Sequence, residues 1–379
     1  MTPTTPLTSI PLGALRSGRG AYWARYSSKV PSTTCSLMAP LQTTRRYGAK
    51  PATVECSPID HWEGTVEFGE FKNTEAFNPT FKRVRELGLE QHAFELDSYG
   101  FTVVPPDKVA DRAFFERIRE TVLRVCKERT GIEFDLEQNG TFGEYKAQPQ
   151  SDGQFLLFYL LMADRIFEEW ILNPTLYTLI DYLMRGQQQL SSLTSFVKWK
   201  GERKGLGLHS DSPPDRDGRL PACSDVANAA YCLTDYTLEN GCIAMVPGSH
   251  LYCRQPRAGE GEDSAVPVEA EAGSLIAWHG NTWHGAFEKK TDGLRLNVTS
   301  YHCHRRLKNQ ENYQWRVSQE MLDRNPPEFA RLVAADDHMG WDEHGPDYSR
   351  GIRYLSPEAK KRLQAMRSRR TEPKKASAA

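Results

Sequence analysis

Two histidines and an aspartate in the second half of the chain have the residue types and spacing of a metal-binding set. His209-Ser210-Asp211 places an imidazole and a carboxylate two residues apart. Side chains at positions i and i+2 of a strand point to the same side, so both can bind one ion. A histidine from a distant strand, His284, would complete the set. Two histidines and one carboxylate on one face of a metal leave open positions, which is typical of non-haem Fe(II) oxygenases.

The surroundings of His284 strengthen a motif that would be weak alone. The chain has ten histidines, so a His-x-Asp triplet can arise by chance and its context decides. Arg295 follows His284 by eleven residues, on the next predicted strand. A guanidinium there can form a two-pronged bond to a buried carboxylate. His279, in the same segment as His284, is the rival for the third ligand position.

Short apolar and β-branched runs past Gly186 indicate the strands that would position these residues. Gly, Pro and Asn turn signals separate the runs, and no helical pattern intervenes. Such a series predicts a β-sandwich or a jelly roll (double-stranded β-helix, cupin-like), with flanking helices. We assign this core to residues 191–310. The expected strands are 193–199, 206–209, 226–234, 242–246, 274–279, 282–287 and 294–301.

Residues 78–190 precede the core and are predicted to be mainly helical, packed on the outside of the sheet. A helix over 81–96 is followed by an extended piece at 100–104, which a Pro-Pro pair terminates. Asp107 is expected to cap the next helix. Apolar residues between Phe114 and Cys126 recur there at helical spacing and predict one buried stripe.

Further apolar and helical patterns complete the flanking parts. Residues 155–170 are so apolar that they should be covered on most sides, and Asn173-Pro174 starts a helix. Residues 311–370 are predicted to form C-terminal helices and loops, and residues 371–379 a disordered basic tail. The segment 254–263 contains two glycines and is expected to be a mobile surface loop at the mouth of the barrel.

Residues 1–54 have the composition of a mitochondrial presequence. They contain seven Lys and Arg residues and no Asp or Glu, and they are rich in Ser, Thr and Pro. The alternative is a disordered extension without an address, because early prolines oppose a clean amphipathic helix. We therefore expect either a mitochondrial or a cytoplasmic protein, and we exclude this segment from the fold.

Composition limits the partners of the remaining chain. The rest of the sequence has 41 of the 48 basic residues and all 49 acidic ones, a net charge of −8. This balance gives no reason to expect nucleic acid as a partner. The longest apolar run, 155–162, is too short to span a membrane. The eight cysteines show no paired spacing and are expected to be reduced thiols.

The motifs resemble those of the phytanoyl-CoA dioxygenase family. Members carry HxD, then Asn-Gly followed by Pro-Gly-Ser-His, then a Trp-His-Gly-like element and an Arg. In this chain the resemblance covers residues 90–310. The matching elements are His209/Asp211, Asn240-Gly241, Pro247-Gly248-Ser249-His250, Trp283-His284-Gly285 and Arg295.

The resemblance implies an Fe(II)- and 2-oxoglutarate-dependent dioxygenase that also uses O₂ and acts on a small molecule. The metal ligands would be His209, Asp211 and His284. Arg295 would hold the distal carboxylate of 2-oxoglutarate. The remaining cosubstrate contacts would come from Ser210, Ser195 and Asn228. The spacing of His279 to Arg295 fits the family less well than that of His284.

Two positions depart from the family pattern. Members often have Trp where Ala230 stands and Ser or Thr where Ala286 stands. Because Asp211 supplies the carboxylate ligand, a halide has no vacant ligand position, so hydroxylation or desaturation is favoured over halogenation. No CoA-binding patch is recognisable, so the family name does not identify the substrate.

Two other functions compete with this interpretation. A cupin-type metal enzyme that does not use 2-oxoglutarate would have no need of Arg295. A non-catalytic jelly-roll binding protein would usually have lost a ligand, whereas all three are present here. Oligomeric state is not indicated by the sequence.

Overall fold

The computed structural model describes residues 79–137, 153–200 and 205–337, with residues 341, 343–345, 348–353, 360, 361, 363 and 364. All of them belong to one compact unit, Glu67–Ala379. The presequence-like residues 1–54 and the tail at 371–379 lie outside the described residues. In the described part, no helix is both long and apolar enough to cross a membrane.

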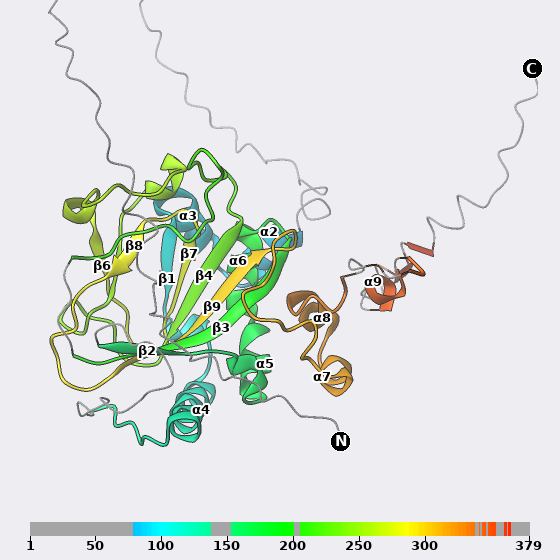
Figure 1. The fold of residues 1–379 in the computed structure, drawn as a ribbon, viewed down its shortest axis with the longest axis horizontal. Helices are drawn as coiled ribbons and strands as arrows, with labels where there is room; N and C mark the ends of the chain where they lie inside the picture. The colour runs from blue at the N-terminus through cyan, green and yellow to red at the C-terminus, as the bar shows by residue number, and fades with distance from the viewer. Residues whose placement is uncertain are drawn as a thin grey trace, which may run out of the picture. The chain divides into compact units, whose positions relative to one another are not determined.

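Two antiparallel sheets form the centre of the fold (Figure 1). The larger has the strand order β1-β7-β4-β9-β3-β2, and the smaller has the order β6-β5-β8. This arrangement is the mostly-β jelly roll that the sequence predicts, and the fold prediction is confirmed. The strands are β1 (Phe101–Val104), β2 (Gln154–Leu157), β3 (Gln188–Lys198), β4 (Val226–Cys232), β5 (Ile243–Met245), β6 (Val266–Val268), β7 (Leu275–His279), β8 (His284–Ala286) and β9 (Arg295–His304).

Helices cover the face of the larger sheet that is turned away from the smaller one. The largest apolar cluster lies between them, where Leu176 and Ile180 of α6 join Leu193 of β3 and Val298 of β9. α3 and α6 lie beside the sheet in Figure 1. The helices are α2 (Pro79–Glu86), α3 (Glu90–Tyr99), α4 (Arg112–Thr130), α5 (Ile166–Ile171), α6 (Pro174–Leu183), α7 (Gln319–Arg324), α8 (Pro327–Leu332) and α9 (Ser349–Arg353).

A second apolar cluster lies between the two sheets. It joins Ile276 and Trp278 of β7 to Ile243 and Met245 of β5. Burial of these side chains holds the sheets face to face, since each fully buried apolar side chain contributes roughly 1.5–3 kcal/mol. The larger sheet therefore has one face covered by helices and one face turned towards the smaller sheet. Along each central strand, successive side chains point alternately to these two faces.

Local sequence signals explain the helix ends, with one correction. Asp111, not Asp107, caps α4, because its side chain accepts a hydrogen bond from the backbone N–H of Phe114. Asp107 instead lies in a short 3-10 helix, Pro106–Lys108. Gly131, with φ of 74°, ends α4.

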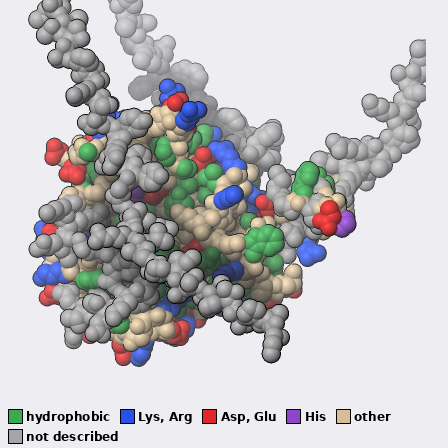
Figure 2. All heavy atoms as spheres, in the orientation of Figure 1, with side chains coloured by type: hydrophobic (Ala, Val, Ile, Leu, Met, Phe, Trp, Pro, Cys, Tyr) green, Lys and Arg blue, Asp and Glu red, His purple; other side chains and the backbone are tan. Residues whose placement is uncertain are grey.

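The apolar stretch at 155–170 does not form one continuous helix. Its first residues form β2, which pairs with β3; a short 3-10 helix, Leu160–Met162, follows, and the α-helix begins only at Ile166. On the face drawn in Figure 2, hydrophobic side chains gather towards the middle and charged ones lie mostly around the edge. Phe158, the residue after β2, is 40% exposed.

Candidate active site

His209, Asp211 and His284 come together at one point of the inter-sheet face. One ligand atom from each lies within 4.8 Å of the others. The Nε2 atom of His209 is 3.5 Å from Asp211 Oδ1, and that of His284 is 3.2 Å from Asp211 Oδ2. His284 begins β8, and an isolated antiparallel bridge pairs it with His209. Both backbone hydrogen bonds of that bridge are 2.9 Å long.

The hydrogen bonds of the two imidazoles leave the correct nitrogens for a metal. His209 Nδ1 lies 2.9 Å from Gly207 O, and His284 Nδ1 lies 3.0 Å from Thr282 O. A carbonyl oxygen only accepts, so each Nδ1 must carry the proton. Nε2 is then the nitrogen of each ring that could bind a metal, and both Nε2 atoms face the same carboxylate. Such carbonyl partners are the usual way of orienting metal-binding histidines.

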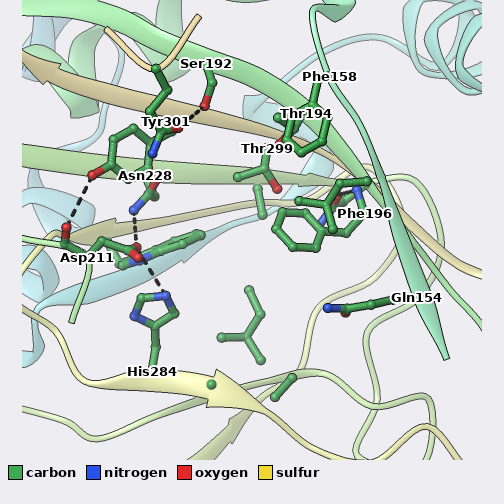
Figure 3. Close-up of a pocket in the computed structure, with 18 of the residues that line it drawn as sticks. Gln154, Phe158, Ser192, Thr194, Phe196, Asp211, Asn228, His284, Thr299 and Tyr301 are labelled. Carbon is green, nitrogen blue, oxygen red and sulfur yellow. Dashed lines mark hydrogen bonds and ion pairs between the residues drawn. The ribbon is translucent and has the colours of Figure 1, made fainter. Parts of the chain in front are cut away.

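Asp211 is held in its ionised form. Burial opposes ionisation, but the adjacent imidazoles of His284 and His209 more than offset it and bring the pKa of Asp211 well below its ordinary value. The side-chain amide of Asn228 donates to Asp211 Oδ2 at 2.6 Å (Figure 3). Two imidazoles and an ionised carboxylate are a donor set that fits Fe(II).

A cavity of about 840 Å³ opens beside these three residues. Figure 3 shows Thr194, Phe196 and Thr299 on its wall, with Asp211 and His284 at one side. Every second residue of β9 from Arg295 to Tyr301 lines it. Together, β3, β4 and β9 contribute Ser192, Thr194, Phe196, Asn228, Ala230, Arg295, Asn297, Thr299 and Tyr301.

Arg295 is a buried cation on the wall of this cavity. Only 4% of the residue is exposed. Its Nη1 donates to the carbonyl of Gly241, and its Cζ lies 4.7 Å from the centroid of the Tyr236 ring. Among the described residues its Nε has no hydrogen-bond partner, and no carboxylate lies within ion-pair distance. Because a buried charge is costly without a counter-charge, the carboxylate of 2-oxoglutarate fits this position.

The sequence of the chain matches a known protein family. The profile of the family "Phytanoyl-CoA dioxygenase (PhyH)" matches residues 96–297, just over half of the chain. The chain belongs to the phytanoyl-CoA dioxygenase family. Enzymes of this family use Fe(II), 2-oxoglutarate and O₂, the cofactors that the sequence predicts.

Relatives in this family come from distant organisms. A dioxygenase of Aspergillus fumigatus is 28% identical over 207 residues, which are 52% of this chain and 65% of that protein. An uncharacterized protein of Mycobacterium tuberculosis is 24% identical over 261 residues, 67% of this chain and 87% of that one. The phytanoyl-CoA dioxygenase of Arabidopsis thaliana is 24% identical over 62% of this chain and 83% of its own length.

Solved structures with a similar fold include two that contain a metal ion and the cosubstrate. The epimerase SnoN, in complex with Fe³⁺ and alpha ketoglutarate, is 21% identical, with a TM-score of 0.42 over 57% of this chain and 84% of that one. HygX of Streptomyces hygroscopicus, with nickel and 2-oxoglutarate bound, is 17% identical, with a TM-score of 0.44 over 58% and 88%.

Among the cosubstrate contacts that the family resemblance implies, Asn228 lies at the cavity and the two serines do not. Ser210 Oγ is buried and donates to Gly280 O at 2.8 Å. Ser195 lies on the opposite face of β3 from Thr194 and Phe196, towards the helices. The expectation that Ser210 and Ser195 contact the cosubstrate is therefore corrected. Ser210 lies between two ligands that face the same side, so its own side chain points the other way. Both faces of β3 are buried, so the sequence does not reveal which face Ser195 is on.

His279 lies away from the metal ligands. It follows Trp278 on β7, and Trp278 lines the cavity, so the His279 side chain lies on the other face of the strand. Its ring centroid is 5.3 Å from that of His250. Burial, with smaller contributions from His250 and Arg185, lowers the pKa of His279 to about 3.

Thr194, Asn297 and Thr299 are among the residues of the cavity wall that the sequence did not single out. The two β9 residues follow Arg295 at intervals of two, so strand periodicity counted from Arg295 would have found them. Asn297 donates to the hydroxyl of Tyr236 at 2.8 Å. That hydrogen bond fixes the ring on which the Arg295 guanidinium rests.

Both departures from the family pattern lie on the cavity wall. Ala230 and Ala286 each contribute a methyl group where members often have a larger or a polar side chain. The cavity therefore has more apolar volume beside β4 and β8 than the usual residues would leave.

Proposed function

We propose that this protein is an Fe(II)- and 2-oxoglutarate-dependent dioxygenase that hydroxylates a small organic molecule and releases succinate and CO₂. One observation carries the proposal: two imidazoles, a carboxylate and a buried guanidinium all line one cavity. The guanidinium distinguishes this function from that of a cupin-type enzyme without 2-oxoglutarate, because such chemistry has no use for a buried cation there.

Each residue has a role that follows from its surroundings. The Nε2 atoms of His209 and His284 and the carboxylate of Asp211 would hold the metal on one face. Arg295 would neutralise the distal carboxylate of the cosubstrate. When bound, Fe(II) and 2-oxoglutarate supply the means of activating O₂ for C–H oxidation. The apolar part of the wall excludes water, which keeps that reactivity directed at the substrate.

The rest of the cavity supports a largely apolar substrate with a few hydrogen-bonding groups. Phe158 and Phe196 line it with neutral polar side chains such as Gln154, Ser192 and Thr194. Ser192 Oγ already donates to Gln310 at 2.6 Å, so its lone pairs remain for a substrate donor. The carboxylate ligand Asp211 leaves no ligand position for a halide, which favours hydroxylation or desaturation over halogenation.

The proposal is tested by succinate release from purified protein with Fe(II), 2-oxoglutarate and O₂. We expect slow uncoupled turnover without substrate, abolished in His209→Ala and Asp211→Ala. The matched control is His279→Ala, which removes an imidazole outside the cavity and should retain turnover. Turnover that survives His209→Ala, or that does not require 2-oxoglutarate, would contradict the proposal. A panel of apolar hydroxylatable compounds then identifies the substrate through stimulated succinate release.

We also propose that residues 1–54 direct the protein to mitochondria, with the cytoplasm as the alternative. Their seven basic and no acidic residues support this address. A fluorescent protein fused after residue 54 should enter mitochondria. A variant with all seven basic residues changed to Gln should remain in the cytoplasm. A wild-type fusion that stays in the cytoplasm would rule the address out.

A further inference from the structure

The metal ligands His209 and Asp211 lie in an extended segment next to β8 that is not part of a named strand. In the described residues 205–211, one isolated bridge is present, between His209 and His284. Successive residues of an extended chain point their backbone groups to opposite edges. Because the N–H and C=O of His209 face His284, those of Ser210 face away from β8. Ser210 is 6% exposed, so these two backbone groups need partners other than water.

One side chain supplies both partners. Gln255 Oε1 accepts from the backbone N–H of Ser210 at 2.8 Å, and Gln255 Nε2 donates to the carbonyl of Ser210 at 2.8 Å. The same amide nitrogen lies 3.4 Å from the carbonyl of Ser212. The amide thus takes the place of a neighbouring strand along this edge. The Ser210 peptide is held on one edge by Gln255, and its side chain by Gly280.

The segment that carries Gln255 is itself fixed to the second metal-ligand segment. Arg254 forms a two-pronged ion pair with Glu260, at 2.8 and 2.6 Å. Its guanidinium carbon lies 4.8 Å from the centroid of the Trp283 ring. The indole N–H of Trp283 donates to the carbonyl of Arg254 at 2.7 Å. Trp283 directly precedes His284, so one short segment contacts both parts of the chain that supply metal ligands.

These contacts correct the expectation of a mobile loop at 254–263. An ion pair, a ring contact and three hydrogen bonds to the site tie its first residues down. Ser210 lies between the two ligands of the HxD pair. Gln255 holds its peptide groups, and the carbonyl of Gly280 holds its side chain, so both contacts affect the orientation of the two ligands.

We propose that Gln255 is a positioning residue for the metal site. It acts through the backbone of Ser210, and it sets the orientation of the imidazole of His209 relative to the carboxylate of Asp211. This inference rests on the proposed metal centre. It predicts that loss of the Gln255 amide weakens metal binding more than it weakens the fold, because partners of metal ligands typically contribute 10- to 100-fold in affinity.

The test uses full-length protein and Co(II) alone, whose visible spectrum reports coordination geometry. Gln255→Met keeps the length of the side chain and removes both hydrogen bonds. We expect the Kd for Co(II) to rise about 10-fold or more, with a changed visible spectrum. Gln255→Glu keeps the acceptor for the Ser210 N–H and loses the donor, so we expect a smaller rise. The second variant carries the test if the first does not fold.

The matched control is Gln189→Met. Gln189 is also a buried amide, and it donates to the carbonyl of Leu307 at 2.8 Å outside the cavity. Its Tm should fall while its Co(II) affinity and spectrum stay as in the wild type. A folded Gln255→Met protein that binds Co(II) within about twofold of wild type, with an unchanged spectrum, would overturn the inference alone. Wild-type protein that binds no more Co(II) than His209→Ala would overturn the metal centre as well.

Discussion

Asn228 donates a hydrogen bond from its side-chain amide to Oδ2 of Asp211, the oxygen that also faces His284. Asn228 belongs to β4 of the larger sheet, whereas His284 belongs to β8 of the smaller one. The carboxylate is therefore oriented from both sheets. Figure 3 shows the amide and the imidazole on either side of it.

The first prediction concerns this hydrogen bond. Asn228→Ala should raise the Kd for Fe(II) by about 10-fold, because the carboxylate loses the donor that fixes its rotation. Asn228→Asp also removes the donor, but its added negative charge attracts the cation, so we expect a smaller loss of affinity than in Asn228→Ala. Anaerobic metal titration measures both effects. Unchanged affinity in both variants would show that the imidazoles and the backbone suffice to orient Asp211.

The second prediction separates cosubstrate binding from metal binding. Arg295→Gln should raise the KM for 2-oxoglutarate roughly 10- to 100-fold, because each charge-assisted hydrogen bond contributes about 1.5–3 kcal/mol. Arg295→Lys should recover only part of this loss, since an ammonium lacks the planar fork.

The matched measurement for Arg295 is Fe(II) affinity in the absence of 2-oxoglutarate. It should stay within about twofold of wild type in both variants, because Arg295 contributes no metal ligand. An equal loss of metal affinity and cosubstrate affinity would instead indicate a general disturbance of β9.

The third prediction is a pH dependence of stability from His302. This residue is fully buried, and its two ring nitrogens have no partner among the described residues. Burial lowers the pKa of His302 to about 3, from 6.5 in the unfolded chain. Between these values the unfolded chain binds the proton and the folded one does not, so the free energy of unfolding falls as pH is lowered below 6.5.

The size of the effect and its control follow from the same linkage. The contribution of His302 should approach about 1.4 kcal/mol per pH unit between pH 6 and pH 4.5. His302→Leu should reduce the slope of unfolding free energy against pH by this amount, measured with urea. An identical slope in wild type and variant would mean that the buried imidazole is protonated in the fold.

The fourth prediction concerns the glycine after His284. A Cβ on Gly285 would lie 2.1 Å from the backbone oxygen of Leu206. Gly285→Ala should therefore push residues 206–209 away from β8 and disrupt the bridge between His209 and His284, with loss of metal binding. Gly131→Ala is the control, because a Cβ there meets nothing within 4 Å. It should cost about 1 kcal/mol from its positive φ and leave metal binding intact.

The sequence predicted the sheets and the ligands because both have strong local signals. Strands bounded by Gly, Pro and Asn were recognisable, and Arg295 stood out as a charge in an apolar strand. β2 was missed because a short apolar run fits a buried strand and a buried helix equally well.

The cosubstrate contacts were harder to predict for a different physical reason. Almost every residue of β3 is buried, so no alternation of polar and apolar residues shows which side faces the cavity. A register shift between Leu190 and Ser192 further changes the pairing with β9. Gln255 was missed because its role depends on hydrogen bonds to a backbone 45 residues away, which no local pattern records.

The position of the ligands on β8 and on the segment that is bridged to it has a thermodynamic consequence. A bound ion would act as a cross-link between β8 and the segment before β4, which the isolated bridge between His209 and His284 also joins. Ligand linkage then adds about 2.7 kcal/mol to the stability of the folded form when free metal exceeds its Kd 100-fold. Iron supply would thus set how much of this protein survives in the cell as well as how fast it turns over, and chelation should lower its Tm reversibly.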